Sequence, residues 1–336
     1  MICNMEPKFS VVVNCFNRRE FVKDALNSAC LQSIKRSQYE ILLIKNFYDS
    51  DIDSFLDEND IKSIYAQETT TGSWFEIAAN IAKGDFIVFL DDDDLMHPNK
   101  LEILQSTINI DPKIVYIHNN SEKSNSTFWP IEFEKMKITE ININSDSQFR
   151  KALKKRYYFN LSSITIKREI IVDWLSFIRE TNHGTDFVMF FSAILSGEKM
   201  IDYDDYLTFY RIHPSSHGNF KAKGIEEFEN EKQKVLPSYL KNWEIYSSFT
   251  NSDILVKYAK VRLTTTKIWL NLISSSIIYK VNFSELIENI SGLTLYPNYI
   301  LFIMIYYFDR LFHRATRKIY YMIIYSWVGW KLRENT

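Results

Sequence analysis

The feature that most constrains this chain is a run of five apolar residues that ends in four consecutive carboxylates. Phe86–Leu90 reads FIVFL, and Asp91–Asp94 follow it directly. A fully apolar run of this length is typical of a strand that is buried on both faces of a sheet. Such a strand brings all four carboxylates to its carboxyl end, which is where open α/β sheets bind their ligands.

Four adjacent carboxylates repel one another. Two like charges about 6 Å apart repel by roughly 1 kcal/mol in water and several-fold more at the effective dielectric of a protein. A divalent cation removes this cost, and Mg²⁺ and Mn²⁺ prefer carboxylate and diphosphate oxygens. Because side chains alternate along a strand, we expect Asp91 and Asp93 to point one way and Asp92 and Asp94 the other. The alternative is a solvated acidic turn that caps the next helix, which the buried strand and the preceding Gly84 disfavour.

Short strands and helices alternate over the first two hundred residues, which indicates a parallel sheet with helices on both faces. Ser73 and Glu76 have the spacing of a capping box at a helix start. Between Asn119 and about Tyr158 the pattern dissolves, as expected for an insertion. Strands are expected at Phe9–Val13, Tyr39–Ile44, Ser63–Ala66, Phe86–Leu90, Ile114–His118, Ser163–Ile166 and Tyr206–Tyr210, and helices at about Glu20–Leu31, Ser73–Lys83, from near Pro98, Glu169–Phe177 and Thr185–Leu195.

Composition and missing motifs exclude several classes of protein. The 40 Lys and Arg against 42 Asp and Glu provide no basic field for nucleic acid. The three cysteines form no disulfide framework, and the first residues contain no apolar signal stretch, so a cytoplasmic location is expected. The sequence has neither a Gly-x-Ser-x-Gly elbow nor a Walker-type loop, which disfavours hydrolases and ATPases. His97 and His118 lack partners at zinc-ligand spacing.

The C-terminal part of the chain differs in character from the rest. After the polar stretch Asn219–Gln233 the pattern is helical, and the apolar runs Tyr299–Phe308 and Tyr320–Val328 are both much shorter than the roughly 20 residues of a membrane span. Aromatic apolar runs separated by cations are typical of a segment at the headgroups of an anionic membrane. The alternative is a helix pair that packs on the catalytic domain. The cations are Arg310, Arg314, Arg317, Lys318, Lys331 and Arg333.

Three segments together resemble the nucleotide-sugar-binding half of the family 2 inverting glycosyltransferases of the GT-A fold. They are Ser10–Arg18 (SVVVNCFNR), Glu40–Ile44 (EILLI) and Gly84–Asp94 (GDFIVFLDDDD), and the resemblance covers about residues 8–215. It implies an α/β fold, with a GT-A-type, Rossmann-like mixed sheet flanked by helices and a helical C-terminal region. The implied domains are 1–218, with a donor half at about 8–119 and an acceptor half at about 120–218, and 219–336.

The resemblance also implies roles for the donor-side residues. The loop Asn14-Cys15-Phe16-Asn17 stands where the family has Pro-x-Tyr-Asn, so its backbone and aromatic ring would hold the nucleobase. The family's second strand usually ends in a carboxylate that reads the base. Here Lys45 and Asn46 follow, so Asn46 makes that contact or it is lost, which leaves the base open. Asp91 and Asp92 fall in the nucleotide-sugar site, Asp93 ligates the metal, and Asp94 supports it.

On the acceptor side, the resemblance places the general base at Asp186, where Thr185 replaces the family's usual Glu. The alternative is an acidic residue that only stabilises the helix dipole, and this helix position is expected to lower the pKa of Asp186. The segment Tyr210-Arg211-Ile212-His213 resembles the family's Tyr-Arg-x-His. It implies that Arg211 binds the nucleotide sugar and that His213 meets the metal, which would stabilise the leaving nucleotide.

The sequence thus predicts a metal-dependent, inverting glycosyltransferase of the hexosyltransferase type, with Mg²⁺ or Mn²⁺ as cofactor. It would transfer a sugar from a nucleoside-diphosphate sugar to a hydroxyl of a glycan or a lipid-linked acceptor, at the cytosolic face of the cell membrane. One alternative is a silent nucleotide-sugar-binding scaffold, which the changes at Thr185 and Lys45 favour. Another is a nucleotidyltransferase, although the loop Asn14–Arg18 contains no glycine.

Overall fold

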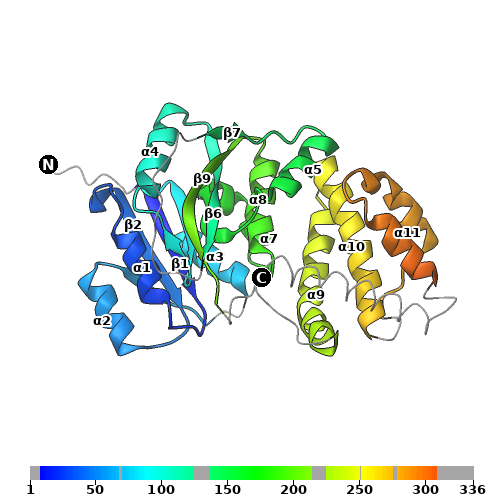
Figure 1. Ribbon diagram of the computed structural model, residues 1–336, viewed down its shortest axis with the longest axis horizontal. Coiled ribbons are helices and arrows are strands. Elements are labelled where there is room, and N and C mark those ends of the chain that lie inside the picture. Colours follow the sequence, from blue (N-terminus) through cyan, green and yellow to red (C-terminus); the bar gives the residue numbers. More distant parts are fainter. Residues whose placement is uncertain are drawn as a thin grey trace. The chain divides into compact units, whose positions relative to one another are not determined.

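The chain folds into two compact units in this computed structural model (Figure 1), which describes residues 8–67, 70–124, 137–213, 225–249, 251–274 and 278–308. Unit 1 comprises residues 1–143 and 151–216, and unit 2 comprises residues 144–150 and 217–336. Each unit has its own hydrophobic core.

Unit 1 is built on a nine-stranded sheet in the order β3-β2-β1-β4-β8-β6-β9-β5, with β7 paired to β9. The first four of these strands are parallel, whereas β8 is antiparallel to both of its neighbours. The sheet is therefore mixed, as the resemblance implied, and not parallel throughout. The strands are β1 Phe9–Cys15, β2 Tyr39–Lys45, β3 Lys62–Tyr65, β4 Phe86–Asp91, β5 Leu95–Met96, β6 Ile114–Ser124, β7 Ile138–Glu140, β8 Ile164–Lys167 and β9 Lys199–Arg211.

Helices cover both faces of this sheet, which explains why its central strands are apolar on both sides. Alternate residues of β1 and β4 pack with α1 and α4 in one cluster, while Phe89 contacts Phe75 of α3 on the other face. The helices of this part are α1 Val22–Cys30, α2 Ser50–Glu58, α3 Thr71–Ile81, α4 Lys100–Ile110, α6 Arg168–Asp173, α7 Leu175–Ile178 and α8 Thr185–Ser196, with 3₁₀ turns η1 Arg36–Gln38 and η2 Leu161–Ser163. Helix α5 Asp146–Lys155 belongs to unit 2 up to residue 150 and to unit 1 from residue 151.

A glycine fixes how β4 lies beside β1. A Cβ atom on Gly84 would lie 2.5 Å from both the Phe9 carbonyl carbon and the Ser10 nitrogen, so only glycine fits there. The Gly84 N–H also donates to the Ser10 hydroxyl at 2.9 Å. The resulting register places Asn14, near the end of β1, directly beside Asp91 at the end of β4. This alignment determines where the acidic run emerges from the sheet.

Several local expectations differ from the structure. Thr70, and not Ser73, caps α3, because the Thr70 hydroxyl accepts the Ser73 N–H. Helix α2 was not expected. Five of its nine residues are exposed and are either acidic or serine, and only Ile52 and Leu56 are buried, so its apolar periodicity is weak. Helix α5 falls in the stretch expected to be an insertion. Residues 125–136 of that stretch lie outside the described part of the chain.

Unit 2 is helical, as the sequence pattern predicted. It contains α9 Ile225–Ser247, α10 Asp253–Ser274, α11 Phe283–Glu288, the 3₁₀ turn η4 Asn289–Thr294 and a helix that begins at residue 299 and is described to residue 308. Tyr299 and Tyr306 of this last helix are buried in a core with Leu240 and Val261. No described helix is long and apolar enough to cross a membrane. The run Tyr320–Val328 and the cations from Arg310 onward lie outside the described residues.

Candidate active site

The carboxyl ends of three parallel strands meet at one edge of the sheet in unit 1. The register pairs Asn14 of β1 with Ile44 of β2 and with Asp91 of β4. Residues that follow these strand ends therefore lie together, and the edge is the expected place for a ligand. The predicted donor-side residues that meet here are Asn14, Cys15, Phe16, Asn17, Asn46, Asp91, Asp92, Asp93 and Asp94.

Three of the four aspartates form one acidic cluster. Strand β4 ends at Asp91, and the chain then turns so that the Asp94 N–H donates to the Asp91 carbonyl oxygen at 3.2 Å. Carboxylate oxygens of Asp91, Asp93 and Asp94 all lie within 4.8 Å of one another. The expected alternation was thus wrong for Asp94, because strand geometry ends at Asp91. The Asp92 carboxylate is not part of this cluster and forms an ion pair with Arg18 instead.

The Asp91 carboxylate has neither a hydrogen bond nor an ion pair to any described residue. Burial raises its pKa well above the usual range, and the charges of Asp94, Asp93 and Asp92 raise it further. A nearby cation favours the ionised form of such a carboxyl group, and the Arg18 charge only partly offsets the burial of Asp91. Asp91 is therefore the cluster member whose oxygens remain open to a ligand.

Both carboxylate oxygens of Asp94 accept hydrogen bonds from other residues of the protein. One of its oxygens accepts hydrogen bonds from the Asn160 amide at 3.0 Å and the Ser162 hydroxyl at 2.6 Å, and the other accepts the Arg211 backbone N–H at 3.1 Å. Burial raises the pKa of Asp94 to about 7, with a further contribution from Asp93. Asp94 thus anchors the turn to neighbouring segments, which agrees with a supporting role.

Two arginines and a histidine contact Asp93. Its Oδ2 lies 2.8 Å from the Arg18 guanidinium and 2.8 Å from Nε2 of His213, and its backbone oxygen accepts the Arg211 Nε–H at 2.9 Å. Arg211 also forms an ion pair with Asp24 at 3.0 Å. The structure therefore brings both predicted C-terminal residues of the site, Arg211 and His213, to Asp93.

Two cations were not among the predicted site residues. Arg18 pairs with Asp92 and Asp93, and its place directly after the first-strand loop was the signal that could have identified it. Lys100 is completely buried and donates to the Ser162 carbonyl at 2.7 Å, beneath the acidic cluster. Burial lowers the pKa of Lys100 to about 7. Its sequence position in an amphipathic helix carried no sign of this contact.

The donor set of the cluster fits a divalent cation. Carboxylate oxygens are the ligands that Mg²⁺ and Mn²⁺ prefer, and Asp91 offers a carboxylate that no described protein group neutralises. Asp91 and Asp93 would hold the ion, with His213 next to Asp93. Repulsion among the three carboxylates is the physical reason for such a site.

The loop after β1 is held by side-chain contacts within the protein. Asn17 adopts a left-handed conformation with φ of 59°. Its backbone N–H and side-chain oxygen both bond the Asn46 amide, at 2.9 and 3.0 Å. Cys15 is fully buried, its thiol donates to the Arg18 carbonyl at 2.7 Å, and burial raises its pKa. Asn46 and Cys15 therefore shape the loop, and Cys15 can meet a ligand only through its backbone.

An aromatic side chain and an amide of this loop remain available to a ligand. Phe16 is 54% exposed, and its ring lies 5.5 Å from that of the buried Trp74. The Asn14 side-chain oxygen is buried and has no hydrogen-bond partner in the described residues. Lys45, where the family usually has a carboxylate, is almost completely buried and pairs with Asp53. The charge of Lys45 is thus neutralised internally.

Asp186 lies in the first turn of α8, after Gly184, which adopts a left-handed conformation with φ of 68°. Burial raises the pKa of Asp186 to about 6, although the Phe187 N–H and the Arg156 charge act in the opposite direction. The expectation that the helix start would lower this pKa was wrong. Desolvation of the carboxylate outweighs the partial positive charge of the helix end.

Residues 158–160 connect Asp186 with the acidic cluster. The Phe187 ring, next to Asp186, stacks on Tyr158 with centroids 3.9 Å apart. Two residues further along the chain, the Asn160 amide donates to Asp94. Asp186 and the acidic cluster are consequently attached to the two ends of one short segment. The predicted catalytic residue and the predicted metal-binding residues therefore lie in the same unit and contact the same short segment.

A buried histidine holds this connecting segment. Nδ1 of His118 lies 2.6 Å from a carboxylate oxygen of Asp202, and its Nε2 contacts the Phe159 carbonyl oxygen. His118 and Asp202 lie on the paired strands β6 and β9. His118 therefore has a structural role in unit 1.

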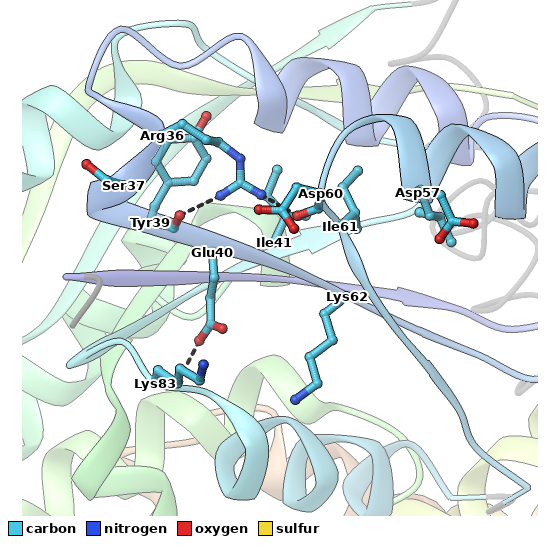
Figure 2. A pocket seen from close by; sticks show the side chains of 11 residues that line it. Arg36, Ser37, Tyr39, Glu40, Ile41, Asp57, Asp60, Ile61, Lys62 and Lys83 are labelled. Atoms are coloured by element: carbon cyan, nitrogen blue, oxygen red, sulfur yellow. Dashed lines mark hydrogen bonds between the residues drawn. The ribbon is translucent and has the colours of Figure 1, made fainter. Parts of the chain in front are cut away.

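A separate cavity of about 800 Å³ lies elsewhere in unit 1 (Figure 2), lined by residues at the amino ends of β2 and β3. Its Arg36 guanidinium donates to the backbone oxygens of Tyr39 and Asp60, at 2.6 and 2.7 Å. The acidic cluster follows the carboxyl end of β4, which is parallel to β2 and β3, and therefore lies at the other edge of the sheet. The cavity is thus not part of the candidate active site.

A family model described as "Glycosyl transferase family 2" matches residues 10–172, which contain the first-strand loop and the whole acidic run. This segment is a family 2 glycosyltransferase domain. A comparison of the sequence with curated proteins finds no significant match.

Solved structures share the fold at low sequence identity. TarS of S. aureus has a TM-score of 0.54 at 16% identity over 92% of this chain, which spans only 54% of that protein. Its fragment 1–349 in complex with UDP-GlcNAc has a TM-score of 0.55 at 15% identity, covering 98% of this chain and 92% of the fragment. A mannosyltransferase from Pyrobaculum calidifontis, in complex with GDP-Man and Mn²⁺, has a TM-score of 0.54 at 12% identity, covering 92% and 88%. These likenesses establish the GT-A fold of the domain.

The acidic cluster yields a prediction about metal binding. Asp93→Asn should abolish the rise in melting temperature that Mn²⁺ and UDP or GDP give together, because it removes a carboxylate ligand. A ligand at 100 times its Kd stabilises by about 2.7 kcal/mol. The variant should still fold, since it loses one of three repelling charges.

The stabilisation of the wild type by Mn²⁺ and nucleotide should also depend on pH. The rise in melting temperature should be larger at pH 8 than at pH 6, because protons bind the carboxylates of the cluster near pH 6 and compete with the metal.

Thermal unfolding by circular dichroism or dye fluorescence measures this effect. Asp173→Asn is the matched control, because Asp173 is exposed and far in sequence from the cluster. The control should keep the full shift. A full Mn²⁺-dependent shift in Asp93→Asn as well would contradict the assignment of Asp93 as a ligand.

Proposed function

We propose that this chain is a metal-dependent, inverting glycosyltransferase of the hexosyltransferase type. It transfers a sugar from a nucleoside-diphosphate sugar to a hydroxyl of a glycan or of a lipid-linked acceptor. The observation that carries this proposal is the link between the acidic cluster and Asp186 through residues 158–160. The catalytic domain is residues 1–218, with a donor half at about 8–119 and an acceptor half at about 120–218, followed by the helical region 219–336.

The donor is bound at the carboxyl ends of β1, β2 and β4. The exposed Phe16 ring and the unpartnered Asn14 oxygen face the nucleobase and ribose, and the amide pair of Asn17 and Asn46 keeps their loop in place. The complexes of similar proteins with UDP-GlcNAc and with GDP-Man support a nucleotide-sugar donor.

The diphosphate is bound at the acidic cluster. Mg²⁺ or Mn²⁺ held by Asp91 and Asp93 would neutralise the diphosphate and stabilise its charge as it leaves. The guanidinium groups of Arg18 and Arg211 add positive charge at Asp93, and the His213 imidazole lies beside it. Asp92 contributes by orienting Arg18. Such preorganised charge stabilises the leaving group without rearrangement during the reaction.

Asp186 is the general base. Its carboxylate accepts the proton of the acceptor hydroxyl while that oxygen attacks the anomeric carbon from the side opposite the diphosphate. The bond from the anomeric carbon to the diphosphate oxygen breaks, so the configuration inverts and the nucleoside diphosphate leaves. With a pKa of about 6, Asp186 is mostly ionised at pH 7 and is a stronger base than an ordinary aspartate.

The role of Asp186 predicts a defined kinetic defect. Asp186→Asn should lower kcat by about 10² or more and leave the affinity for the donor almost unchanged, because proton transfer occurs only in the transition state. In the wild type, kcat should rise with pH around 6 and then level off, since the base must lose its proton. Release of nucleoside diphosphate in the presence of acceptor measures both quantities.

Two results would contradict this assignment. Loss of donor affinity in Asp186→Asn would place Asp186 in the donor site or in the folding core. An unchanged kcat would show that Asp186 is not the general base. If the wild type binds nucleotide but releases no nucleoside diphosphate with any glycan or lipid-linked acceptor, the scaffold alternative is favoured.

We further propose that the C-terminal region places the enzyme on the cytosolic face of the membrane, where a lipid-linked acceptor is accessible. Two described helical segments of unit 2 expose apolar side chains at helical spacing, and the Phe283 and Tyr307 rings lie 6.3 Å apart. An interfacial helix binds through apolar area and through attraction of its cations to anionic lipids. The exposed side chains are Phe283, Ile287, Ile290, Ile300, Met304 and Tyr307.

Membrane binding can be tested with the full chain. It should sediment with anionic vesicles at low salt and detach partly in high salt, because salt screens the charge contribution. The double variant Ile287→Glu with Met304→Glu should stop sedimenting but stay folded, since both side chains are at least half exposed. Ile110→Glu, at an 85% exposed position of unit 1, is the control and should bind as the wild type does. Unchanged sedimentation of the double variant would exclude this surface.

A further inference from the structure

Arg156 occupies a position that normally suits glycine. It directly follows α5 and adopts a left-handed conformation with φ of 59°. Its N–H donates to the Leu153 oxygen at 3.1 Å, and the Tyr157 N–H donates to the Ala152 oxygen at 3.2 Å. These two bonds form the Schellman motif, in which glycine is favoured because a Cβ atom is unfavourable at positive φ. An arginine here breaks a local rule, and such positions are often functional.

The Arg156 guanidinium is held by an aromatic ring. It lies 3.7 Å from the centroid of Phe159, which is the geometry of a cation–π contact. The Arg156 side chain is exposed, and its guanidinium forms neither a hydrogen bond nor an ion pair with any described residue. Stacking thus fixes the plane of the guanidinium and leaves its N–H donors available. An arginine so oriented is suited to a bidentate contact with phosphate or carboxylate.

A second cation lies on the same rings. The Lys123 ammonium is 5.7 Å from the centroid of Phe159 and 5.7 Å from that of Tyr210. The two rings are themselves 6.0 Å apart. Arg156 and Lys123 therefore place two positive charges around one aromatic pair, although they come from different elements of unit 1.

The rings that hold these cations lie along the segment that reaches both Asp186 and the acidic cluster. Phe159 follows Tyr158, whose ring stacks on Phe187 next to Asp186. The Arg156 charge lowers the pKa of Asp186, so the two groups are within electrostatic range. The donor diphosphate already has positive groups of its own at Asp93. Since Arg18 and Arg211 already serve the diphosphate, Arg156 and Lys123 are available for a second ligand that approaches Asp186.

We propose that Arg156 and Lys123 form an anion-binding subsite for the acceptor, which carries a phosphate or carboxylate near the hydroxyl that reacts. The proposal rests on the proposed function, because it takes Asp186 as the general base. Arg156 makes the bidentate contact with the anion, and Lys123 adds a point charge. The exposed, ring-held guanidinium also explains why arginine stands where the backbone favours glycine.

The test uses three probes that share one sugar ring: glucose 6-phosphate, glucuronate and uncharged glucose. Their binding to the full chain is measured by ligand-observed NMR titration, with and without UDP and Mn²⁺. The wild type should bind the charged probes about tenfold more tightly than glucose, which is the effect expected of one well-placed ion pair at intermediate dielectric. Arg156→Gly should abolish this preference, and Arg156→Lys should retain part of it.

Controls separate binding from folding. Arg156→Gly should melt at the wild-type temperature or higher, because glycine adopts this conformation without strain. Lys155→Ala removes a neighbouring exposed cation from the same helix end and should keep the preference for charged probes. The affinity for UDP with Mn²⁺ should be the same in all variants.

Several results would overturn the proposal. These are no preference for charged probes in the wild type, a preference that survives in Arg156→Gly, or equal loss of the preference in Lys155→Ala. Weaker UDP binding in Arg156→Gly would assign the guanidinium to the donor diphosphate instead. Failure of the proposed function looks different: UDP would bind to none of the proteins, while the comparison among the sugar probes would remain informative.

Discussion

Repulsion among carboxylates at the end of one buried strand is the constraint on which the rest of the site depends. Strand β4 cannot shift along β1, because Gly84 lies against the backbone of Phe9 and Ser10. Its acidic run therefore emerges at a fixed point beside the end of β1. Three carboxylates within 4.8 Å of one another need compensating charge, and the surrounding segments of unit 1 supply it in different ways.

The compensation is uneven, and this unevenness gives each residue a distinct chemistry. Asp94 is satisfied by hydrogen bonds from neighbouring segments, and Asp93 by Arg18 and His213. Asp91 receives no such partner from the described residues. A divalent cation with a diphosphate would complete the balance at Asp91, and the same balance explains why binding of metal and of nucleotide should be coupled.

Much of the fold and of the candidate site could be predicted from the sequence, because the motifs that indicate them are short, continuous segments. The apolar run before Asp91 predicted β4, and the order of the motifs predicted a mixed GT-A sheet, which the structure has. The alternation of the aspartates failed because the chain turns directly after Asp91. Arg18 and Lys100 were missed because their partners are many residues away, and only tertiary packing brings them together.

Asp186 shows a second limit of local reasoning. The family resemblance named it as the candidate base, and its position at a helix start predicted a lowered pKa, but the sign of the pKa shift came from burial, which only the folded chain determines. Arg156 is similar, since nothing in its sequence neighbourhood shows that it takes a left-handed conformation and stacks on Phe159. Both residues depend on the segment 158–160, whose role is visible only in three dimensions.

The central claim is that Asp91 and Asp93 hold a divalent cation together with the donor diphosphate. Its most direct test is a crystal structure with Mn²⁺ and UDP or GDP, with data collected near the manganese absorption edge so that anomalous scattering locates the ion. We expect one strong anomalous peak, at an ion that is bonded to carboxylate oxygens of Asp91 and Asp93 and to diphosphate oxygens. Nucleotide bound at this edge without a manganese peak at Asp91 and Asp93, or a peak only at another place, would contradict it.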